Sequence, residues 1–311
     1  MRLIAAFALL LLAGMACAQT TAAPQSPQAP GTQAPPPPSA QTQPAPTQSG
    51  GRPPVQAKSA PEYQAYQTAV GNMNNADAME KAADDFASKF PDSELRVLLY
   101  RAAMNSYQNA GNSLKMMDMG LKVLTIDKDD PEALIGVAEV LEERTSPTDL
   151  DKEQRSNQAI SYAQHALETI DTDLAVPAGT PADRVEAYKK YLRATAMVII
   201  GTVQYKREQY ADAESNLRKA IETDSANPDP VVILRLALAL DQQKKYPEAL
   251  EQANRAVQLT QENTEVGKTA RNERDRLVTV TGGNNTPTAP SSSPASPQNA
   301  TTPERSTTPG Q

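Results

Sequence analysis

A spacing of 36 residues recurs in the C-terminal half of this 311-residue chain and constrains its fold more than any other feature. Tyr210 and Ala213 lie three positions apart, and the same pair of residue types returns 36 positions later as Tyr246 and Ala249. A repeat of roughly 20 to 50 residues is typical of stacked supersecondary units, because one such unit cannot bury its apolar face alone. The sequence therefore predicts a solenoid.

Small residues mark the places where two helices of one unit would touch. Two antiparallel helices approach closely only where their side chains are small, and larger residues then fill the gaps around them. Glycine or alanine is expected in the first helix and alanine in the second, with an aromatic residue at the turn. The residues that carry this packing signature are Gly201, Tyr210, Ala213, Leu217, Ala220, Ala237, Tyr246, Ala249, Ala253 and Ala256.

These motifs resemble those of tetratricopeptide repeats. The segments 210–213 (Tyr-Ala-Asp-Ala) and 246–249 (Tyr-Pro-Glu-Ala) are similar to the start of the second helix in that family, and Gly201 and Ala237 match its small eighth residue. The chain departs from the family at Met197 and Ile233, where an aromatic residue is usual. The resemblance implies an all-α, helix-turn-helix repeat solenoid that binds protein or peptide partners and is not an enzyme.

We expect about five such units between residues 61 and 280, because the alternation of helical segments and breaks extends upstream. Their approximate ranges are 62–91, 92–127, 131–171, a fourth unit whose long first helix runs to about Gln209, and a fifth that ends near Gln261. A last helix over 264–278 is expected to cap the stack. The flanking segments, 19–60 and 281–311, are rich in Pro, Gln, Ala, Ser and Thr, which predicts disordered arms.

The first 18 residues have the composition of a secretory signal peptide. A basic residue precedes an apolar run that is too short to span a bilayer, and Ala16-Cys17-Ala18 fits a cleavage site. The sequence thus predicts an exported protein, periplasmic or envelope-associated, that begins at Gln19. The alternative is a lipoprotein anchored through Cys17, in which case the chain contacts a membrane.

The amino-acid composition argues against a catalytic, metal or cofactor site in this chain. The chain contains one Cys and one His, and its formal net charge is −7. We therefore expect no metal site, no cofactor, no catalytic residues and no nucleic-acid partner. We interpret His165 as a surface residue. Asp127, Asp129 and Asp130 are interpreted as a turn between helices, and the methionines near 116–119 as helix core.

Partner binding is instead expected on the concave face, which the first helices line in such solenoids. The predicted groove residues are Arg101, Asn105, Ile135, Glu139, Val198, Thr202, Tyr205, Leu234 and Leu238. Arg101 and Asn105 have the spacing of a clamp for peptide carboxylates, but Gly136 and Ile199 in the next units cannot complete it. The leading hypothesis is a scaffold for envelope assembly, secretion or cell-wall complexes. An accessory subunit of an envelope enzyme complex and a mechanical spacer or tether are the alternatives, and the sequence leaves the oligomeric state open.

Overall fold

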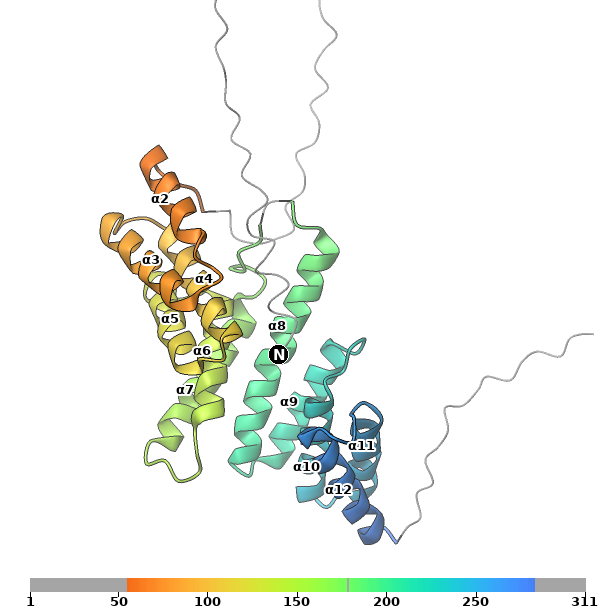
Figure 1. Cartoon of the computed structure of the whole chain (residues 1–311). Helices are drawn as coiled ribbons and strands as arrows, with labels where there is room; N and C mark the ends of the chain where they lie inside the picture. The colour runs from red at the N-terminus through yellow and green to blue at the C-terminus, as the bar shows by residue number, and fades with distance from the viewer. Residues whose placement is uncertain (1–54, 178, 283–311) are drawn as a thin grey trace, which may run out of the picture.

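The computed structural model describes residues 55–177 and 179–282, which form helices joined by connections that are short except for the longer one between α7 and α8 (Figure 1). The predicted signal peptide, Cys17 and most of the two predicted arms lie outside the described residues. The helices are, in chain order, α2 (Ala60–Val70), α3 (Ala76–Lys89), α4 (Leu95–Asn109), α5 (Ser113–Ile126), α6 (Pro131–Arg144), α7 (Lys152–Thr169), α8 (Ala182–Lys206), α9 (Tyr210–Thr223), α10 (Pro230–Gln242), α11 (Tyr246–Gln258) and α12 (Glu265–Val280).

Consecutive helices pack as pairs, and the pairs stack in series. The pairs are α2 with α3, α4 with α5, α6 with α7, α8 with α9, and α10 with α11. Each second helix also packs on the first helix of the next pair, so the stack continues from one end to the other (Figure 1). The predicted all-α solenoid of helix-turn-helix units is confirmed, and α12 packs against α10 and α11 at its C-terminal end.

The seam inside the fourth pair shows how the small residues act. Gly201 of α8 lies against α9 so closely that an added Cβ would be 3.0 Å from Cγ of Leu217 and 3.3 Å from the carbonyl oxygen of Ala213. In the next pair, Ala237, Ala249, Ala253 and Ala256 are fully buried. Larger side chains such as Leu217 and Leu240 fill the space between neighbouring seams. Small contact positions thus set the distance between helices.

Three of the turns within pairs share one backbone geometry. Gly111, Glu208 and Lys244 each adopt a left-handed conformation, with φ of 70°, 61° and 61°. In each turn the next amide donates back to a carbonyl at the end of the first helix, as Gln209 does to Gln204 at 2.9 Å and Lys245 to Leu240 at 3.0 Å. These are the bonds of a Schellman motif, which satisfies the last carbonyls of a helix. Two of the three positions carry side chains although glycine adopts this conformation at lower cost.

This turn corrects the predicted end of α8. The periodicity predicted a helix to about Gln209. In the structure α8 ends at Lys206, because Glu208 adopts a left-handed backbone conformation that a right-handed helix cannot continue through. The helix is nonetheless the longest of those described, with 25 residues, and its N-terminal half projects beyond the neighbouring α9 (Figure 1). Among residues 55–177 and 179–282, no helix combines the length and apolar character that a bilayer-spanning segment needs.

Candidate functional site

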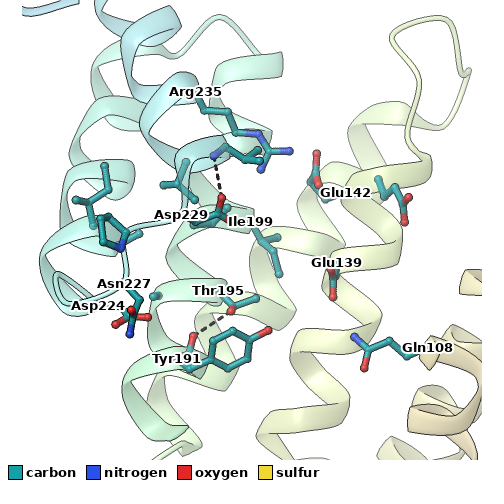
Figure 2. Close-up of a pocket in the computed structure, with 18 residues that line it drawn as sticks. Gln108, Glu139, Glu142, Tyr191, Thr195, Ile199, Asp224, Asn227, Asp229 and Arg235 are labelled. Carbon is teal, nitrogen blue, oxygen red and sulfur yellow. Dashed lines mark hydrogen bonds between the residues drawn. The ribbon is translucent and has the colours of Figure 1, made fainter. Parts of the chain in front are cut away.

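A groove of about 540 Å³ opens between α6, α8 and α10, near the middle of the stack (Figure 2). Its walls come mainly from the first helices of three consecutive pairs. The C-terminal end of α9, the loop from Asp224 to Asp229 and Gln108 of α4 complete it. The groove is therefore a product of stacking, since no single helix pair contains more than part of its lining.

The groove has an apolar wall and an acidic wall. Ala194 and Val198 on α8 and Val231 on α10 are half-buried apolar residues of the lining, with Ile199 and Val232 buried behind them. On the opposite side, α6 contributes three carboxylates one after another along one helix face. They are Glu139, Glu142 and Glu143. Apolar surface with a few convergent polar groups is typical of binding sites.

The three glutamates differ in their surroundings. Glu142 forms an ion pair with Lys206 of α8 at 2.8 Å. Glu139 and Glu143 form no ion pair with any side chain in the part of the chain that the structure describes. Burial raises the pKa of Glu139 above its ordinary value, and the neighbouring charge of Glu143 raises it further. Glu139 is thus a partly desolvated carboxylate that a cation would stabilise.

Polar groups on the other wall frame the apolar surface. The ring of Tyr191 points across the groove towards α6, and the Thr195 hydroxyl donates to the Tyr191 carbonyl oxygen at 2.9 Å (Figure 2). The Asp229 carboxylate accepts from the Val231 amide at 2.8 Å and so caps α10. Arg235 is the one basic residue of the described lining, against five acidic ones. The groove as a whole is acidic.

Two of the nine predicted groove residues, Glu139 and Val198, line this groove. That they contact a partner stays a prediction. Asn105, Tyr205 and Leu238 are half-buried but lie outside the groove lining. Ile135, Thr202 and Leu234 are buried in the structure, and a contact between them and a partner also stays a prediction.

Arg101 needs a correction, because its side chain is only 5% exposed and belongs to a buried polar network. Its guanidinium forms an ion pair with Asp130 and, through Nε, a second with Glu132 at 3.1 Å. Tyr188 of α8 donates its hydroxyl to Glu132. Arg101 therefore joins three successive first helices, α4, α6 and α8. It is not free to grip a peptide carboxylate.

The other residues that the sequence singled out also have structural roles. His165 of α7 forms hydrogen bonds with Asp129 at 2.8 Å and Glu168 at 3.3 Å. Partial burial lowers the pKa of His165, but these bonds and the nearby charges more than offset that effect and raise it overall. Met116 and Met119 are buried in the core. No cluster of three or more potential metal ligands occurs among the described residues.

Sequence reasoning missed Glu142, Glu143, Tyr191, Thr195 and Arg235. A signal for some of them was present, since three glutamates at positions i, i+3 and i+4 share one face of a helix. Tyr191, Thr195 and Val198 follow the same rule on α8, with spacings of four and three. If these two faces on consecutive first helices had been recognised, the groove would have been predicted closer to the N-terminal half of α8.

Comparisons with known proteins give matches among solved structures. No family model matches the chain, and no curated protein does either. The chain is similar to TTC0263, a thermophilic TPR protein of Thermus thermophilus, with 15% identity over 68% of this chain and 98% of that one and a TM-score of 0.41. It is similar to PilF of Pseudomonas aeruginosa, with 15% identity over 71% of this chain and 92% of that one and a TM-score of 0.45. A third is YrrB, a TPR protein with an unusual peptide-binding site, with 16% identity over 67% and 90% and a TM-score of 0.44.

Proposed function

We propose that the protein is an exported scaffold that holds a segment of a partner protein in the groove between α6, α8 and α10. The observation that carries this proposal is the groove itself, in which apolar and charged side chains from three consecutive first helices converge. Several apolar residues there are only half-buried, among them Val198 and Val231. A bound segment would cover them, and no covalent step is involved.

Export is the second part of the proposal and is supported by the sequence of the first 18 residues. The basic start, short apolar run and small residues around Cys17 favour cleavage after Ala18, and they leave lipid attachment at Cys17 as the alternative. Either route would place the folded region outside the cytoplasm. The envelope is therefore where we propose that the partner is met.

Photocrosslinking from defined positions tests this function in cells that make the protein. A photoreactive residue in place of Glu143 lies in the groove, whereas one in place of Glu251 lies exposed on α11, a second helix. We expect a discrete adduct from position 143 and none from position 251. Val231→Asn makes the apolar wall polar at a half-buried position at a small cost in helix propensity, and it should remove the adduct.

Adducts of equal yield from both positions, or none from position 143, would count against the proposed function. So would an adduct that Val231→Asn leaves unchanged, because that result would place the partner away from the apolar wall. The mature full-length chain is used throughout, so that the terminal segments are present.

A further inference from the structure

The charge of the groove indicates which partner segments it accepts. Its described lining contains five carboxylates and one guanidinium. Glu142 is neutralised by Lys206, and Asp229 is engaged in capping α10. Glu139, Glu143 and Asp224 form no ion pair with another described residue, and all three belong to the lining. An uncompensated negative charge therefore lies beside apolar surface.

We infer that the groove selects partner segments that carry lysine or arginine next to apolar side chains. This inference rests on the proposed function and names the chemical class of the partner. The apolar side chains would cover Ala194, Val198 and Val231, which are half-buried, and the cations would face α6. Complementary charge contributes more to specificity and association rate than to affinity alone, which suits a scaffold that must choose among exported chains.

The chain's own segments fit this groove poorly. Residues 19–54 contain one basic residue, Arg52, and residues 283–311 contain one, Arg305, which follows Glu304. A second copy is also a poor occupant, because the chain carries a formal net charge of −7 and the basic residues of the terminal helix α12 are already paired. Arg276 contacts Asp241 and Glu273, Arg274 contacts Asp275, and Lys268 contacts Glu265. A different, basic protein is the occupant that the charges favour.

Three short synthetic peptides provide the probe. Leucine and alanine are interleaved with lysine in the first peptide, with glutamine in the second and with glutamate in the third, and both ends are blocked to remove terminal charges. Binding to the mature full-length chain is followed by fluorescence anisotropy. We expect the lysine peptide to bind about tenfold more tightly than the glutamine peptide and the glutamate peptide to bind least.

Two matched variants locate the effect. Glu139→Gln/Glu143→Gln keeps the shape of the groove and should weaken binding of the lysine peptide about tenfold while leaving the glutamine peptide unchanged. Glu222→Gln/Glu251→Gln removes the same charge from exposed positions on α9 and α11 and should change neither. Raising the ionic strength from about 0.1 M to about 1 M shortens the Debye length from about 10 Å to about 3 Å and should weaken only the lysine peptide.

Equal affinity for the lysine and glutamate peptides overturns the inference, as does a groove variant that behaves like its surface control. If the glutamine peptide binds and Val231→Asn abolishes that binding while charge makes no difference, the charge preference fails and the proposed function stands. If no peptide binds and position 143 yields no crosslink, both fail.

Discussion

Replacing Arg101 with methionine is expected to lower the free energy of unfolding by about 3–5 kcal/mol, because it leaves buried carboxylates without their counter-charge. Asp130 is completely buried, and Glu132 lies beside it at the start of α6. Methionine keeps most of the side-chain volume, so the loss reports charge more than packing. Urea unfolding followed by circular dichroism measures it.

A matched surface variant separates this effect from the general cost of losing an arginine. Arg155 pairs with Asp149 at 3.2 Å, and its side chain is 27% exposed. Arg155→Met should cost less than about 1 kcal/mol, since exposed pairs contribute little. Equal losses from the two variants would show that the buried network does not hold α4, α6 and α8 together.

The loss in free energy of unfolding caused by Arg101→Met should also become smaller as the pH falls from neutral. Burial already raises the pKa of Glu132 above its ordinary value, and the Arg101 charge opposes that rise. Without Arg101 the pKa of Glu132 rises further, so the folded variant binds more protons than the unfolded chain in mildly acidic solution. Its stability relative to the wild type therefore increases as pH decreases through that range.

The second large effect concerns the seam between α8 and α9. Leu217 is completely buried against Gly201, and Leu217→Ala should cost about 2–5 kcal/mol through lost burial and the cavity left behind. Gly201→Ala alone should also destabilise the fold, by about 1–3 kcal/mol before any gain in helix propensity, because its methyl group would crowd Leu217. Each change is again measured by urea unfolding.

Combining the two substitutions gives a sharper result than either alone. In Leu217→Ala, the methyl group of Gly201→Ala enters vacated space, so the second change should restore stability, with a coupling of about 1–2 kcal/mol. Leu259→Ala is the control, since Leu259 is 47% exposed and its truncation should cost at most about 0.5 kcal/mol. Additive losses would mean that these two side chains do not define the seam.

The repeat architecture was predictable because its determinants are local and periodic. Ala213 and Ala249 occupy equivalent positions in consecutive units, and the contact between two helices of a pair involves residues close in sequence. The turn at Glu208 was harder to predict, because a left-handed residue that is not glycine leaves no compositional mark.

The polar network and the groove depend on contacts between units, which periodicity does not encode. Arg101 meets Asp130 across 29 residues, and Glu132 meets Tyr188 across 56, with the long connection before α8 between them. Asp130 looked like an ordinary turn residue, and its side chain does cap α6 by accepting from the Ala133 amide at 2.9 Å. Its pairing with Arg101 could not be predicted from the sequence pattern, because the pairing depends on how the first helices stack.

Hydrogen–deuterium exchange tests most directly whether the stacked first helices form one groove that holds a partner. The mature full-length chain is compared alone and with the lysine peptide. We predict slower exchange in the loop from Asp224 to Asp229, which lines the groove, and unchanged exchange in residues 259–264, which connect α11 to α12 and include no lining residue. Protection of residues 259–264 with no change at 224–229 would contradict binding in this groove.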